Sequence, residues 1–118
     1  MIVIAGTIDL DADRRDECIA ASIALQRSTR EDEPGCMAYC FAPDPLLPGR
    51  IQVYELWADG AALAAHFTHH NYLGMRAMFA AFGPITADNR KYRVDASEPV
   101  YDAEHRPRAD FFTVAGPS

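Results

Sequence analysis

Cysteine and lysine are scarce in this sequence. The chain has three cysteines with no CxxC spacing, and Lys91 is the one lysine among 11 basic side chains. Binding to the phosphates of nucleic acids or anionic lipids requires clustered basic residues. Here the arginines are scattered and the net charge is −6. We therefore expect neither a nucleic-acid partner nor a membrane partner.

Long hydrophobic runs are also missing. No apolar segment approaches the ~18 residues of a membrane span, and no basic segment followed by an apolar one marks a secretion signal. Three cysteines are an odd number, which fits a reducing compartment. Together these absences predict a cytoplasmic protein.

The composition that remains is that of one globular domain: 118 residues, 49% hydrophobic and 24% charged. Residue patterning predicts strands over 2–8, 36–42, 50–58 and 90–98, and helices over 13–31, 60–70 and 72–82. The order βαββαβ is typical of an α+β, ferredoxin-like plait with a four-stranded antiparallel sheet. This plait accounts for residues 1–98, and a tail follows over 99–118.

Several local signals refine this prediction. Cys18, Ala21 and Leu25 fall at helical spacing and should face the core. Asp59 and Asn71 are good N-caps for the two later helices. In the fourth strand, Tyr92, Val94 and Ala96 are expected to point inward.

The predicted strands are apolar on both faces, although helices can cover only one face of such a sheet. A second sheet from an identical subunit is the simplest cover for the other face. We therefore expect a homodimer. The tail carries Phe111, Phe112 and Val114, which should pack on the helices of its own subunit or on the partner.

An ordered set of residues resembles the antibiotic biosynthesis monooxygenase (ABM) domain family. The set is Glu33-Pro34-Gly35-Cys36, Tyr39, Asp44-Pro45, Tyr54-Glu55-x-Trp57-x-Asp59 and Ala62-Leu63-x-x-His66. The resemblance implies a dimeric α/β barrel. The family includes cofactor-free quinol and polyketide-phenol monooxygenases, haem-degrading enzymes and an isomerase-type member, so the reaction stays open at this point.

Two side chains are candidate catalytic groups. His66 titrates near neutral pH, which suits proton transfer from a phenol or quinol. Glu55 interrupts an apolar strand, so it should be hydrogen-bonded, paired or protonated. We expect His66 to be the base and Glu55 its orienting partner. Alternatively, His66 is a core histidine and Glu55 a structural acid.

Aromatic and amide side chains could form a substrate pocket. A flat aromatic substrate would stack on such rings. The candidate binding residues are Trp57, Tyr72, Asn71, Phe67 and Tyr39. Core packing is the alternative role for most of them.

A metal or organic cofactor is not expected. His66, His69 and His70 have helical spacing, but no motif supplies a third metal ligand. Haem-degrading relatives have an Asn in the first strand, where this chain has Ile4-Ala5-Gly6-Thr7, and this departure disfavours haem. No dinucleotide or phosphate-binding signature is present.

Two functions from different classes follow. The first is a cofactor-independent monooxygenase that oxidises a small electron-rich aromatic, such as a phenol, quinol or polyketide-like compound, with O₂. The second is a non-catalytic dimeric module that binds an aromatic metabolite. Oxygen uptake with hydroquinones and naphthols separates them.

Overall fold

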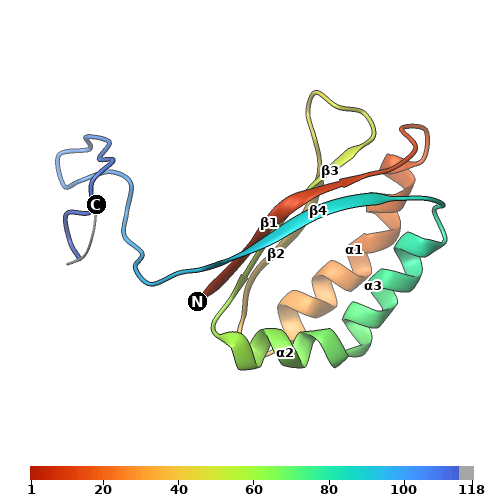
Figure 1. The fold of residues 1–118 in the computed structure, drawn as a ribbon, viewed down its shortest axis with the longest axis horizontal. Helices are drawn as coiled ribbons and strands as arrows, with labels where there is room; N and C mark the ends of the chain where they lie inside the picture. Colours follow the sequence, from red (N-terminus) through yellow and green to blue (C-terminus); the bar gives the residue numbers. More distant parts are fainter. Residues whose placement is uncertain (115–118) are drawn as a thin grey trace.

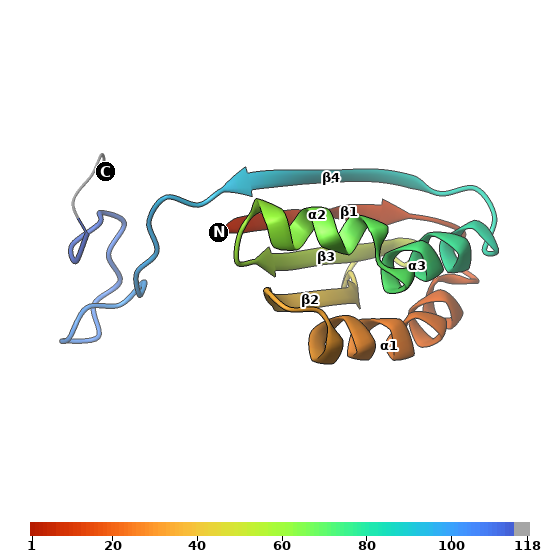
Figure 2. The same cartoon turned by 90° about the horizontal axis from the view of Figure 1, so that it is seen from below.

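A single sheet and a layer of helices make up the computed structural model, which describes residues 1–114. The elements are β1 (Ile2–Asp9), α1 (Arg15–Asp32), β2 (Cys36–Pro43), β3 (Arg50–Trp57), α2 (Gly60–Thr68), α3 (His70–Ala80) and β4 (Thr86–Arg93). The strands lie in the order β2-β3-β1-β4, and all neighbours are antiparallel. The helices lie together on one side of the sheet (Figure 1 and Figure 2). The predicted α+β, ferredoxin-like fold is confirmed.

The two sides of the sheet differ in cover. On β3, Ile51, Val53 and Trp57 are buried beneath the helices, together with Glu55. We call the other side the open face. Its side chains include Val3, Ala5, Ala38, Cys40, Tyr54, Leu56 and Tyr92.

Helix α1 contributes mostly polar side chains to the core. Gln26 joins it to β2, because its amide accepts a hydrogen bond from the Phe41 backbone N–H at 3.0 Å and donates one to the Phe41 carbonyl at 3.1 Å. Ser22 is also buried. The prediction was right for Cys18 and wrong for Ala21, which is exposed. Polar residues that form hydrogen bonds inside the protein occupy the positions where an apolar stripe was expected.

The chain divides α2 from α3 at His69. Asp59 caps α2 as predicted, since its Oδ1 accepts from the Ala62 backbone N–H at 2.8 Å. Asn71 was predicted to cap α3. Instead, His69 caps this helix by accepting from the Asn71 N–H at 3.0 Å, and Asn71 lies buried in the first turn.

Strand β4 begins and ends earlier than predicted. It is an edge strand that pairs with β1, and its side chains are all exposed. Tyr92 was expected to point inward, but it lies on the open face and is 52% exposed. This strand is held by backbone hydrogen bonds to β1. Because its side chains are exposed and mostly polar, its sequence shows little alternation of apolar and polar residues from which its bounds could be predicted.

A C-terminal arm, residues 95–114, leaves the sheet after β4. It extends past the end of the sheet and rises on the side opposite the helices (Figure 1). The arm therefore does not pack on the helices of its own subunit, which was one of the two expectations for the tail. Residues 115–118 of the predicted tail lie outside the described residues. Within residues 1–114, none of the helices combines the length and apolar character that crossing a bilayer requires.

Candidate functional site

A cavity of about 380 Å³ lies between the covered side of the sheet and helices α2 and α3. Its size falls in the range of small-molecule sites. Polar groups reach it from Glu55, His66, Tyr72, Arg76 and Asn89. The remaining lining is Ile8, Tyr39, Phe41, Phe67, Met75, Phe79, Ala80, Ile85 and Ala87. The cavity is therefore mostly apolar, with a few polar groups that could orient a ligand.

His66 is the most buried polar group that borders this cavity, at 2% exposed. Its Nδ1 lies 2.7 Å from Oε1 of Glu33, a buried residue just after α1. A carboxylate only accepts, so Nδ1 carries the hydrogen and Nε2 is left as the nitrogen available to a ligand. Helix α2 supplies the histidine, and the turn between α1 and β2 supplies the acid.

Glu33 holds more than the histidine. Its second oxygen, Oε2, accepts from the Asn71 amide at 3.2 Å and lies 3.9 Å from His69 Nδ1. One buried carboxylate thus ties the end of α1 to both later helices. The expected pairing of Glu55 with His66 is wrong: Glu33 is the partner of His66.

Glu55 has a different partner on its own strand. The indole N–H of Trp57 donates to Glu55 Oε1 at 3.0 Å. Burial raises the pKa of Glu55 from 4.5 to about 7, although the hydrogen bond from Trp57 lowers it, and the nearby charge of Glu33 raises it further. A carboxyl group in this range can either give or take a proton near neutral pH.

Four aromatic rings surround the imidazole of His66. The centroid of Trp57 lies 4.5 Å from that of His66, and Tyr72, Tyr39 and Phe67 follow at 5.3, 5.5 and 6.0 Å. Burial also raises the pKa of the Tyr39 hydroxyl. The structure therefore brings the predicted aromatic residues together around the predicted base.

The predicted binding residues do not all border the cavity. Tyr39, Phe67 and Tyr72 line it, whereas Trp57 and Asn71 lie behind the lining and hold Glu55 and Glu33. Those two residues position the site rather than form its wall.

Sequence reasoning missed Glu33 and Asn89. Glu33 was given no role beyond its place in the Glu33-Pro34-Gly35-Cys36 motif, although an acid at a helix C-terminus opposes the helix dipole and should have a compensating partner. Asn89 lies on β4 opposite Gly6, where an added Cβ would lie only 2.4 Å from its Oδ1. The missing side chain of Gly6 makes room for this amide.

The histidine cluster does not form a metal site. His66 Nδ1 is bonded to Glu33, and His69 Nδ1 accepts from the Asn71 backbone. In the part of the chain that the structure describes, no group of three or more His, Cys, Asp or Glu side chains is placed to hold a metal ion.

Comparison with known proteins bears on the family and the fold. The family model for antibiotic biosynthesis monooxygenase matches residues 1–78. An uncharacterised protein of Synechocystis sp. is 38% identical over 66 residues, which are 56% of this chain and 44% of that protein. The chain thus spans less than half the length of this relative.

Solved structures share the fold at low sequence identity. A candidate antibiotic biosynthesis monooxygenase from Deinococcus radiodurans superposes with a TM-score of 0.76 at 18% identity, over 86% of this chain and 100% of that one. One from Caulobacter crescentus gives 0.68 at 22% identity, over 82% and 90%.

The chain is a small α+β domain with a cavity between its sheet and its helices. Because the family model covers more than half of the chain, the protein belongs to the antibiotic biosynthesis monooxygenase (ABM) family.

Proposed function

We propose that this protein is a cofactor-independent monooxygenase that oxidises a small phenol, quinol or polyketide-like aromatic with O₂. The observation that carries the proposal is the buried Glu33–His66 pair, whose histidine lines a mostly apolar cavity of about 380 Å³. Glu33 fixes the orientation of the His66 ring, because its Oε1 lies 2.7 Å from Nδ1 and leaves Nε2 as the nitrogen that can take a proton.

The reaction needs no external reductant. His66 Nε2 removes the phenolic proton, and the phenolate transfers one electron to O₂. The resulting phenoxyl radical and superoxide combine at a ring carbon that carries hydrogen, giving a hydroperoxide. Loss of water then yields a quinone, so one oxygen atom stays in the product and the other leaves as water. The substrate supplies all four electrons.

The cavity residues have defined roles in this scheme. Arg76 lies near the Tyr72 ring, with Cζ 5.9 Å from its centroid, and both line the cavity. The guanidinium can therefore stabilise the phenolate. Glu55, with a pKa raised by burial to about 7, can donate the proton that the departing peroxide oxygen requires. Apolar walls keep water from quenching the radical pair.

Oxygen uptake tests the proposal directly. Protein dialysed against chelator should consume O₂ with hydroquinones or naphthols, one O₂ for each quinone formed. With ¹⁸O₂, one labelled atom should appear in the quinone. Uptake no faster than in buffer for the whole panel, or uptake that requires added metal or flavin, would contradict the proposal.

One observation favours a second function, that of a binding module for an aromatic metabolite. His66 is 2% exposed, and Glu33 already satisfies its Nδ1, which is also what a structural histidine requires. Saturable quenching of Trp57 fluorescence by naphthols, without any oxygen consumption, would assign this function instead.

We also propose that the protein is a homodimer that buries the open face. Tyr54 and Tyr92 are 45% and 52% exposed there, beside Val3 and Leu56. A second copy would cover these side chains by sheet-on-sheet packing. Light scattering should give twice the mass of the chain, and a single-chain mass at every concentration would contradict this.

A further inference from the structure

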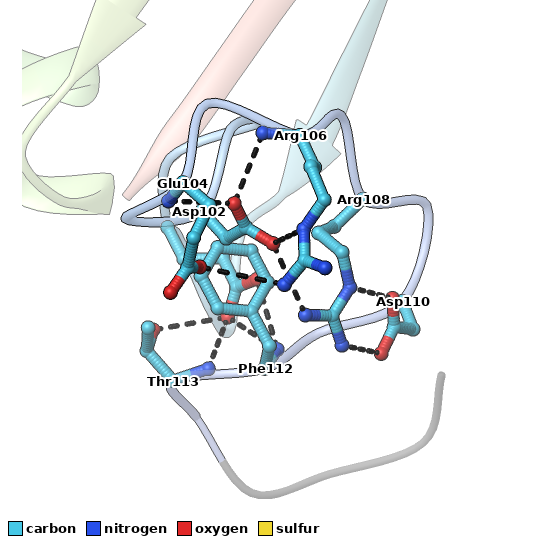
Figure 3. Close-up of polar contacts among 8 residues, drawn as sticks. Asp102, Glu104, Arg106, Arg108, Asp110, Phe112 and Thr113 are labelled. Carbon is cyan, nitrogen blue, oxygen red and sulfur yellow. Dashed lines mark hydrogen bonds and ion pairs between the residues drawn. The ribbon is translucent and has the colours of Figure 1, made fainter.

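The C-terminal arm is held in shape by its own polar contacts. The Asp102 carboxylate, 6% exposed, accepts from the backbone N–H groups of Glu104 and Arg106, each at 3.0 Å, and from the Arg106 guanidinium (Figure 3). Arg108 lies 3.6 Å from the same carboxylate and makes two hydrogen bonds to Asp110. The middle of the arm thus closes around one acid.

A second acid fixes the end of the arm. Glu98 accepts from the backbone N–H groups of Phe112 and Thr113 and from the Thr113 hydroxyl (Figure 3). The guanidinium of Arg108 lies over the Phe112 ring, with Cζ 4.9 Å from its centroid. Glu98 and Thr113, 15 residues apart, are therefore held together.

The arm nevertheless has no core of its own. Apart from the side chain of Asp102, which is buried among polar groups, its residues are half-buried or exposed. Val100, Tyr101 and Phe111 are 62%, 58% and 44% exposed. Ordering a segment costs conformational entropy, which apolar burial normally offsets. A defined shape without such burial indicates that a surface outside this subunit completes the arm.

The position of the arm indicates which surface that is. The arm rises beyond one end of the sheet, on the side of the open face (Figure 1). The β2–β3 loop, residues 44–49, rises on the same side beyond the other end, and its Leu46 is 86% exposed. A molecule lying on the open face would meet both.

The open face indicates that this surface is a second copy of the chain. Four strands of eight residues present a face of about 19 by 27 Å. The sheet of an identical chain has the same size and the same exposed apolar side chains. The arm extends this face beyond the end of the strands.

We propose that the C-terminal arm wraps onto a second copy of this chain, which it contacts through Val100, Tyr101 and Phe111. This inference rests on the proposed homodimer and adds the element that holds it together. The acids and arginines of the arm pair with one another. Its outward contact is therefore made by the apolar side chains.

Two full-length variants test the arm. Asp102→Ala removes the acid around which it closes, and Tyr101→Ser removes an exposed contact while leaving the acid in place. Each should raise the dissociation constant of the dimer at least about tenfold, measured by sedimentation over a dilution series. Glu104→Gln is the matched control, because its exposed ion pair with Arg106 contributes little, and it should stay within about twofold of the parent.

Hydrogen exchange gives a second measurement on the unmodified chain. The backbone N–H groups of Glu104, Arg106, Phe112 and Thr113 should become more protected as the dimer fraction rises. Protection that does not depend on concentration, or a dimer that both variants leave unchanged, would contradict the proposed contact of the arm with the second copy but not the proposed homodimer. A chain that is monomeric throughout would overturn both. The oxygen chemistry is measured separately by O₂ uptake, so its failure is distinguishable.

Discussion

Two buried glutamates border the candidate site, and they are held differently. Glu33 and Glu55 are each 7% exposed. Glu33 accepts a hydrogen bond on each oxygen, from His66 and from Asn71. Glu55 accepts one side-chain hydrogen bond, from Trp57, and borders the cavity.

The comparison separates a positioning role from a reactive one. Both oxygens of Glu33 are engaged by the donors of His66 and Asn71 that it holds in place. Glu55 has a single side-chain donor, borders the cavity and has a pKa that burial raises to about 7. Glu55 is therefore the carboxyl group of the cavity that can exchange a proton near neutral pH.

The largest effect is expected at the group that Glu33 holds. His66→Ala should lower turnover by about 10²–10⁴-fold, the usual contribution of a general base. His66 is buried, so the variant should also lose stability, and turnover must be measured where circular dichroism shows it folded. His70→Ala, an exposed neighbour, is the matched control. A folded His66→Ala protein with unchanged oxygen consumption would remove His66 from the mechanism.

Next in size is the loss of Glu33 itself. Glu33→Ala leaves the buried donors of His66 and Asn71 without their acceptor, and each such donor costs about 1–3 kcal/mol. We expect the free energy of unfolding in urea to fall by about 2–4 kcal/mol. Glu31→Ala, which removes an exposed acid from the last turn of α1, should change it by less than about 0.5 kcal/mol. Equal effects of the two substitutions would show that Glu33 does not hold the site together.

The sequence predicted the fold because local signals agreed with the global pattern. β-Branched and apolar runs marked the first three strands, and Asp59 marked the start of α2. The fourth strand was predicted, but its bounds and the inward orientation of Tyr92 were wrong, because this edge strand is formed by backbone pairing with β1 and carries exposed, polar side chains. The path of the arm was left open between two alternatives, because nothing in a local pattern shows where a segment goes after it leaves the sheet.

The site was predicted only in part. His66 and the rings around it were identified, because their residue types carry chemistry. Its partner was assigned to Glu55, two residues from Trp57, whereas the actual partner lies 33 positions away in the chain. Such a contact depends on how the α1 end packs against α2, which periodicity does not report.

The third prediction concerns how the protonation of Glu55 makes the stability of the folded protein depend on pH. Between pH 4.5 and about 7 the folded protein keeps a proton on Glu55 that the unfolded chain has released. Its contribution to stability is therefore present below pH 4.5 and is lost as the pH rises to about 7, by at most about 3 kcal/mol. Glu55→Gln should lack this contribution, so the stabilities of the parent and the variant should diverge across this window in urea titrations. Parallel pH profiles would show that the pKa of Glu55 is not raised.

The smallest effect tests whether the hydrogen bond from the Trp57 indole influences the pKa of Glu55. The indole of Trp57 donates the one side-chain hydrogen bond to Glu55, and this bond lowers the pKa of Glu55. Trp57→Phe removes the bond. Losing a bond of about 0.5–1.5 kcal/mol should raise that pKa by up to about one unit. Carbon-13 NMR of the glutamate carboxyls measures it, with Glu55→Gln identifying the signal. Tyr54→Phe, on the open face of the same strand, should leave the titration unchanged. If Trp57→Phe also leaves it unchanged, burial and the charge of Glu33 account for the pKa of Glu55 without the indole, and Trp57 serves only to hold the side chain of Glu55 in place.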